Sequence, residues 1–187
     1  MLIYFLYNLR MLQHIPVRRS LININKQAVI ADIVSQLQQE LTSALIAADN
    51  AHKAATDDQS VAETQYDTLA IEQSYLAEGQ SRRVEEIHQA IKSFEAFQFD
   101  LADEQETIMQ GSLVQLEQDI AKQQWFFIAP AAGGYRCKIV DCDVIVNITV
   151  ITPQSPMGST LLGKELDDEV NLLIGTKTRH DFITDIK

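Results

Sequence analysis

Cysteine is scarce in this sequence. The 187 residues contain two, Cys137 and Cys142, which lie five positions apart in an apolar run without a histidine at ligand spacing. Such a pair provides neither the disulfide framework of a small secreted domain nor a zinc site. We therefore expect both thiols to be buried among apolar side chains.

Positive charge is also in short supply. Lysine and arginine total 15 against 26 acidic residues, which gives a formal net charge of -11. Phosphate backbones repel a chain of that charge, so direct nonspecific binding to nucleic acid is disfavoured. The four histidines are scattered, and no two of them share a helix face at the spacing of metal ligands.

A long hydrophobic run is absent as well. The apolar stretch from Met1 to Leu9 is far shorter than the ~20 residues that a membrane span needs, and no small-residue cleavage site follows it. We therefore treat residues 1–24 as an N-terminal extension of uncertain role and expect no membrane partner. Its three arginines, without any acid, suit a tail that binds weakly to a membrane surface or to a partner. The alternative that we favour is that translation was assigned to start too early and that the functional chain begins near Asn25.

Residues 25–98 have the periodicity of two helices. Between Lys26 and Ala55 the apolar residues recur at alternating steps of four and three, as in a helix that packs against another helix. Residues 61–97 continue the pattern with two glutamine interruptions. Because the connection is short, the helices are predicted to be antiparallel and to form a coiled-coil hairpin roughly 40 Å long.

The connection between these helices is acidic. It contains Asp57 and Asp58, and Glu63 stands where the second helical pattern begins. Acids at a helix start stabilise the free backbone N–H groups and the helix dipole, so these residues can be plain caps. They can also form a metal-holding tip that the helices present to a partner.

The pattern changes after Phe99. Residues 99–111 are acidic and are predicted to be a linker, and residues 112–187 contain short β-branched runs bounded by turn signals. Within them one short helix is predicted, with Ser155 as its cap, Pro156 in its first position and Gly163 just past its end. The C-terminal half is therefore predicted to be a small α+β domain.

The stretch "ITPQSPMGSTLLGKELDDEVNL", residues 151–172, resembles the C-terminal domain signature of GreA/GreB-type transcription elongation factors. In that family a Ser-Pro pair, a short helix, a Gly-Lys pair and an acidic-Val pair follow in this order. Here they are Ser155-Pro156, Leu161-Leu162, Gly163-Lys164 and Asp168-Glu169-Val170. The helix, acidic turn and helix of the N-terminal half resemble the family more weakly, in order and length.

The resemblance implies an α+β protein in which an antiparallel helical hairpin precedes a small FKBP-like domain. It implies a cytoplasmic accessory factor of bacterial RNA polymerase, not an enzyme, that inserts its hairpin into the secondary channel and meets nucleic acid only in the elongation complex. Ser155, Pro156, Gly163 and Lys164 become candidate partner-binding residues, although cap and turn roles already account for three of them.

For the acidic tip, the resemblance implies help to the polymerase in cleaving backtracked transcripts. Asp57, Asp58 and Glu63 would be the tip carboxylates, and Asp58 and Glu63 would share a Mg2+ ion with the polymerase, with no cofactor belonging to the chain alone. The family has an Asp, two further residues and then Glu-Asn, with a Tyr four residues after that Glu. Here Asp58 is five residues before Glu63, Thr64 stands in place of the Asn, and Tyr66 comes three residues after Glu63.

Several alternatives follow from these observations. The altered tip spacing favours a Gre-like protein that occupies the channel without stimulating cleavage. The implied fold suggests a peptidyl-prolyl isomerase, for which Trp125, Phe126 and Phe127 are available. A structural adaptor that binds another coiled coil is also possible. Arg82 and Arg83 either contact the polymerase or pair with glutamates along their own helix.

Overall fold

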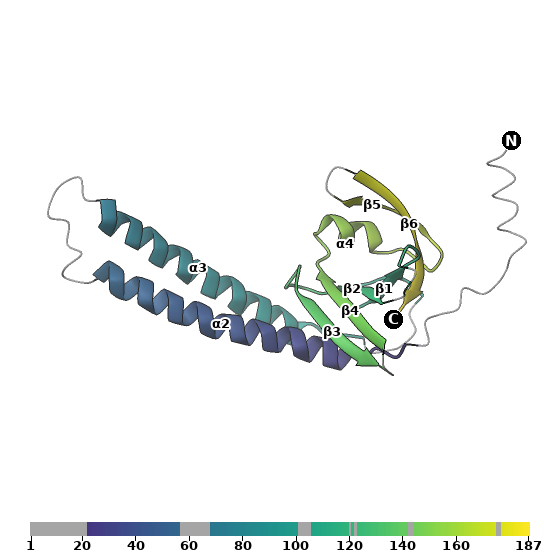
Figure 1. Cartoon of the computed structure of the whole chain (residues 1–187), viewed down its shortest axis with the longest axis horizontal. Coiled ribbons are helices and arrows are strands. Elements are labelled where there is room, and N and C mark those ends of the chain that lie inside the picture. Colours follow the sequence, from purple (N-terminus) through teal and green to yellow (C-terminus); the bar gives the residue numbers. More distant parts are fainter. Residues whose placement is uncertain are drawn as a thin grey trace, which may run out of the picture.

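The computed structural model describes residues 22–56, 68–100, 106–119, 121, 123–141, 144–174 and 177–187. Two long helices are followed by a mixed six-stranded sheet with one short helix, which confirms the α+β class (Figure 1). In chain order the elements are α2 (Lys26–Thr56), α3 (Thr68–Ala96), β1 (Leu113–Leu116), β2 (Gln124–Ile128), β3 (Arg136–Asp141), β4 (Val144–Ile151), α4 (Pro156–Leu161), β5 (Glu169–Ile174) and β6 (Lys177–Ile186).

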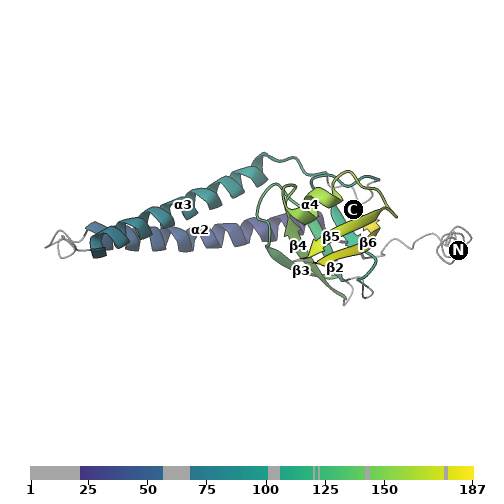
Figure 2. The ribbon, with the colours of Figure 1, turned by 90° about the horizontal axis from the view of Figure 1, so that it is seen from above.

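Helices α2 and α3, which we call the arm, lie side by side in opposite directions and project away from the sheet (Figures 1 and 2). The first helix is capped by Asn25, whose Oδ1 accepts a hydrogen bond from the backbone N–H of Ala28 at 3.1 Å. Part of the predicted stripe is buried, with Leu37 and Ala44 on α2 and Ile87 on α3, whereas Leu76, in the outer half of α3, is 55% exposed. The arm therefore depends on contact between its helices rather than on helix propensity alone.

The sheet has the strand order β3-β4-β2-β1-β6-β5. Strands β2 and β4 are parallel, and the other neighbouring pairs are antiparallel. Because side chains alternate between the two faces of a strand, the sheet carries two apolar clusters. The first faces the arm and includes Leu37, Ile87, Phe94, Trp125, Phe127, Val146, Ile148 and Val150. The second lies on the other face, beneath α4, and includes Val114, Ile128, Ile151, Leu161, Val170 and Ile183.

Some segments are packed more tightly than the sequence suggests. Ile24, within the presumed extension, is 2% exposed and belongs to the first cluster, so the packed part of the chain begins before Asn25. In the presumed linker, Phe99 packs against the first cluster and Ile108 is buried in the second. Strand β6, over Lys177–Ile186, is one that the sequence pattern does not single out.

Strand β6 is hard to predict from the sequence because it contains charged residues. Asp181 and Asp185 are buried in this strand at 2% and 1% exposure. The Oδ1 atom of Asp181 accepts hydrogen bonds from the backbone N–H groups of Gln118 at 3.1 Å and Phe182 at 2.9 Å. A buried carboxylate is tolerated where backbone donors surround it, and that arrangement depends on segments far apart in the chain.

Candidate functional site

The far end of the arm is where the sequence places its candidate acidic tip. Helix α2 ends at Thr56 and α3 begins at Thr68, and both of these ends lie at the extremity of the arm that is remote from the sheet (Figure 1). Asp57, Asp58 and Glu63 fall between them and lie outside the described residues. Within the described ranges, no three His, Cys, Asp or Glu side chains are grouped as a metal site requires.

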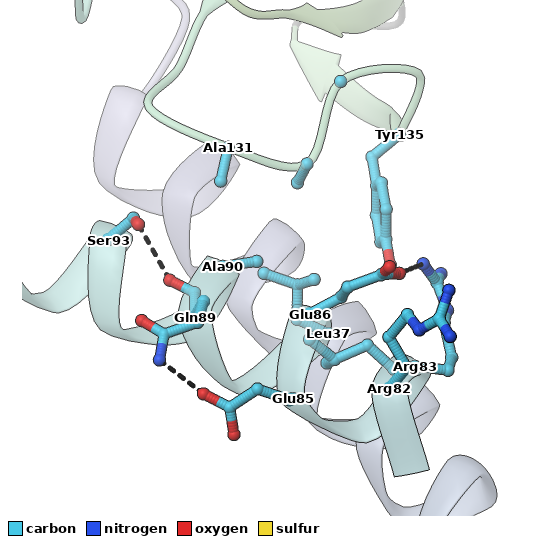
Figure 3. Close-up of a pocket in the computed structure, with 13 residues that line it drawn as sticks. Leu37, Arg82, Arg83, Glu85, Glu86, Gln89, Ala90, Ser93, Ala131 and Tyr135 are labelled. Carbon is cyan, nitrogen blue, oxygen red and sulfur yellow. Dashed lines mark hydrogen bonds and ion pairs between the residues drawn. The ribbon is translucent and has the colours of Figure 1, made fainter. Parts of the chain in front are cut away.

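The base of the arm is tied to the sheet by a polar cluster. Glu40 on α2 accepts a hydrogen bond from the Tyr135 hydroxyl with Oε2, and its Oε1 pairs with Arg83 on α3. Arg83 also lies 3.4 Å from Oε2 of Glu86. Figure 3 shows Tyr135 pointing from the loop before β3 toward Arg83 and Glu86. One carboxylate thus joins both helices of the arm to the loop that begins β3.

Glu40 and Tyr135 shift each other's pKa. The Tyr135 hydrogen bond and then the Arg83 guanidinium hold the pKa of Glu40 below its ordinary value. Burial, and then the neighbouring Glu40 carboxylate, raise the pKa of Tyr135 to about 12. Tyr135 therefore stays a neutral hydroxyl that donates to an ionised Glu40, which is the stronger form of such a bond.

Other contacts fix the direction of the arm. The side-chain amide of Gln36 donates to the backbone carbonyl of Arg136 at 3.2 Å, and Lys26 donates to that of Asp100 at 3.0 Å. Phe99 packs between Phe94 of α3 and Phe127 of β2, with ring centroids 5.8 Å apart in each pair. The arm is therefore held at several points, some polar and some apolar.

Tyr135 and its neighbours border an open cleft between α3 and the loop that precedes β3. Its volume is about 620 Å3. Leu37, Ile87 and Ala90 supply apolar lining, while Arg83 and Glu86 stand on its polar side (Figure 3). Because Arg83 is already paired with two carboxylates, the cleft offers no free cation for an anionic ligand at this residue.

The residues of the C-terminal signature build α4 and anchor it. The Ser155 hydroxyl accepts from the backbone N–H of Gly158 at 3.0 Å and donates to the carbonyl of Thr152 at 2.7 Å, so it caps the helix that begins at Pro156. Gly163 follows α4 with a positive φ of 76°.

The end of the signature is joined to a distant segment. Ile108 donates its backbone N–H to the carbonyl of Lys164 at 2.8 Å and accepts from the backbone N–H of Gly163 at 2.8 Å. The four signature residues thus have structural roles, and Pro156 and Gly163 are exposed. Their binding to a partner stays a prediction.

The sequence pattern predicts α4 but not the polar cluster that ties the base of the arm to the sheet. Both arginines form ion pairs along their own helix, Arg82 with Glu78 at 3.2 Å and Arg83 with Glu86 at 3.4 Å, and Arg83 also pairs with Glu40 on α2. Their contact with a polymerase stays a prediction. Glu40 and Tyr135 were not singled out, since they are 95 positions apart and no local pattern links them. Cys137 is buried as predicted, at 2% exposure, and Cys142 lies outside the described residues.

Among the described residues, no helix combines enough length with enough apolar content to span a bilayer.

Comparisons with known proteins give distant similarities. No protein-family model and no curated protein matches the chain. Among solved structures, GreA factor homolog 1 (Gfh1) of Thermus thermophilus shares 20% identity over 82% of this chain and 94% of that chain, with a TM-score of 0.32. Gfh1 of Thermus aquaticus shares 20% identity over 81% and 92%, with a TM-score of 0.29. A structure of the transcription factor Gfh1 shares 19% identity over 82% and 92%, with a TM-score of 0.32. TM-scores of this size do not establish a common overall fold.

Proposed function

We propose that this chain is a Gre-type accessory factor of bacterial RNA polymerase. The sheet and α4, which we take to be FKBP-like, would dock on the outside of the enzyme, and the arm would enter its secondary channel. One observation carries the proposal: the segment with the Ser155-Pro156 and Gly163-Lys164 signature belongs to a packed unit from which two long helices project.

The arm is long and narrow, as entry into a channel requires. Helix α2 has 31 residues, and at 1.5 Å per residue such a helix is about 46 Å long. Two helices side by side measure roughly 20 Å across. The contacts at Tyr135, Gln36 and Phe99 oppose bending at the base, so the arm would deliver its end to a defined point.

Asp57, Asp58 and Glu63 would be the groups delivered. Carboxylate oxygens are ligands that Mg2+ prefers, and one or two are sufficient when a partner supplies the others. Asp58 and Glu63 would hold a Mg2+ ion shared with the polymerase, and a bound ion would help to activate water and stabilise the leaving oxygen. The chain would thus stimulate the nuclease activity of the polymerase and have no catalytic activity alone.

A second candidate is a channel-binding factor that does not stimulate cleavage. The spacing of the tip acids favours it, because Asp58 is five residues before Glu63 and Thr64 follows that glutamate. A shift of one residue in a helix turns a side chain by about 100°, so a carboxylate can point away from the metal. Binding would then block the channel.

Prolyl isomerase activity is the weaker alternative. Such a site needs accessible aromatic side chains around an apolar pocket. Trp125 and Phe127 are both fully buried in the first apolar cluster, and Phe126 packs against the second. We therefore do not propose this activity.

The test uses backtracked elongation complexes in Mg2+ buffer, incubated with the natural chain or with an Asp57→Ala, Asp58→Ala, Glu63→Ala variant. We expect both proteins to bind the polymerase and only the natural chain to shorten the RNA. An Asp49→Ala, Glu85→Ala, Glu95→Ala variant is the matched control, because it removes three exposed acids elsewhere on the arm.

Each outcome separates the candidates. If all the proteins bind and none shortens the RNA, the non-cleaving candidate is supported. If the natural chain does not bind polymerase at all, the proposed function is wrong in both forms.

A further inference from the structure

One exposed apolar surface lies on the outer part of α3. Ile71, Tyr75 and Leu76 are 56%, 70% and 55% exposed, and none of them belongs to either apolar cluster. The exposed acids Glu72 and Glu78 lie within the same two turns, and Glu78 also pairs with Arg82 at 3.2 Å. We call these five residues the arm patch. It is an apolar surface with an acidic border.

A second exposed apolar surface lies at the β3 edge of the sheet. Val140 and Ile145 are directly paired across β3 and β4 and are 69% and 51% exposed. Arg136 and Lys138 are exposed and precede Val140 by four and two residues, so all three point to one face of β3. We call these four residues the edge patch, an apolar surface with a basic border.

The edge patch is a part of the sheet that the described residues leave uncovered. Alternate residues on the same strands, including Cys137 and Val146, point to the other face and are buried in the first cluster. The second cluster, beneath α4, includes neither Val140 nor Ile145. A helix is a common cover for such an open half-face of a sheet.

The two patches complement each other but lie apart in one molecule. The arm patch precedes Phe94, which packs at the sheet, by about 20 residues, or about 30 Å along a helix. Borders of opposite charge around two apolar surfaces favour their association and fix its orientation. We propose that two copies of this chain associate as an antiparallel pair in which the arm patch of each copy covers the edge patch of the other.

Twofold symmetry strengthens this arrangement. In a closed pair each contact occurs twice, so two small surfaces act together. The net charge of -11 on each copy opposes association, so the pair is in equilibrium with the single chain. Because pairing covers part of α3, the single chain is the form that presents a free arm. The pairing itself does not depend on the proposed function.

Sedimentation equilibrium over a range of concentrations tests the proposal on the full chain. We expect dimers whose dissociation constant rises at least tenfold in Glu72→Lys, Glu78→Lys and likewise in Arg136→Glu, Lys138→Glu. The variant with all four changes restores opposite charges with the signs exchanged, and we expect its dissociation constant to return to within about threefold of the natural value.

Matched controls separate local pairing from total charge. Asp49→Lys, Glu95→Lys changes the net charge by the same amount as the arm variant and also breaks an i,i+4 ion pair, since Asp49 pairs with Lys53 as Glu78 does with Arg82. Lys53→Glu, Lys92→Glu is the equivalent control for the edge variant. Both controls are expected to stay dimeric, with helicity checked by circular dichroism.

Other results would overturn the proposal. A chain that is monomeric at every concentration has no such contact. If neither charge reversal changes the dissociation constant, or if the fourfold variant does not restore it, the dimers use another surface. Species that grow beyond the dimer indicate open head-to-tail association, and loss of dimers on removal of residues 1–21 assigns the contact to that segment.

Discussion

At the residue scale, the hydroxyl of the partly buried Tyr135 donates a hydrogen bond to the Glu40 carboxylate. Burial and then Glu40 raise its pKa to about 12 from 10.0. A raised folded-state pKa stabilises the fold below the unfolded value and loses that contribution as pH rises through the folded value. We therefore expect stability to fall between pH 10 and about 12 and the fall to be smaller in Tyr135→Phe, measured by urea unfolding.

The same substitution has an effect at neutral pH. Tyr135→Phe removes the hydrogen bond to Glu40 and is expected to cost about 0.5–1.5 kcal/mol in the free energy of unfolding. Glu40 keeps Arg83 as a partner, so the loss is not the larger penalty of an unpaired buried charge. An unchanged unfolding midpoint would show that this tie contributes nothing to stability.

Cys137 gives a second prediction at this scale. Burial, and then the neighbouring Asp32, raise the pKa of its thiol to about 12, and only the thiolate is a good nucleophile. In a Cys142→Ser variant we expect no reaction of the native protein with a thiol reagent at pH 8 over hours, and full reaction after unfolding in urea. Rapid labelling of the native variant would contradict the burial of this side chain.

At the element scale, α4 depends on a glycine that no other residue can replace without displacement. A Cβ atom at Gly158 would lie 2.0 Å from the carbonyl oxygen of Thr152, the atom that also accepts from Ser155. We expect Gly158→Ala to destabilise the protein by about 1–3 kcal/mol, since backbone must move to admit the methyl group.

A second glycine is the control for that measurement. Gly79 lies inside α3 with nothing within 4 Å of an added Cβ. Because alanine favours a helix interior over glycine by about 0.5–1 kcal/mol, Gly79→Ala is expected to stabilise the chain. If both substitutions destabilise equally in thermal and urea unfolding, the local explanation for Gly158 is wrong.

Elements with local causes were predictable from the sequence. The cap at Ser155, the proline at the first position of α4 and the stripe through Leu37 and Ala44 are read over a few residues, and the structure contains all of them. Features set by distant segments were not. The parallel pairing of β2 with β4 and the strand β6, with its buried Asp181, depend on partners that no short window contains.

The candidate site follows the same division. The two helices that carry it could be predicted from periodicity, but the tie between Glu40 and Tyr135 joins residues 95 positions apart. The acidic tip stays a prediction, because Asp57, Asp58 and Glu63 lie outside the described residues. The sequence shows which carboxylates are available, whereas their relative positions depend on the conformation of the segment between the helices.

At the scale of the whole molecule, the central claim is that the arm enters the polymerase toward its active centre. The sheet unit and the arm share the first apolar cluster, so that Phe99 and Phe127 join them in one packed body. In such a packed body, the docking of the sheet unit sets the position of the far end of the arm. The claim therefore predicts where the far end of the arm lies in a complex.

The most direct measurement is hydroxyl-radical mapping from an iron chelate at the exposed position Ala54. The chelate is attached through Ala54→Cys in a Cys142→Ser background, in which the buried Cys137 stays unlabelled. In complexes with core polymerase, we predict cleavage of polymerase segments that line the secondary channel next to the active centre. A matched probe at exposed Glu165, near α4, is predicted to cut only the outer surface. Cuts from both probes on the outer surface, or no cuts from either, would contradict entry of the arm.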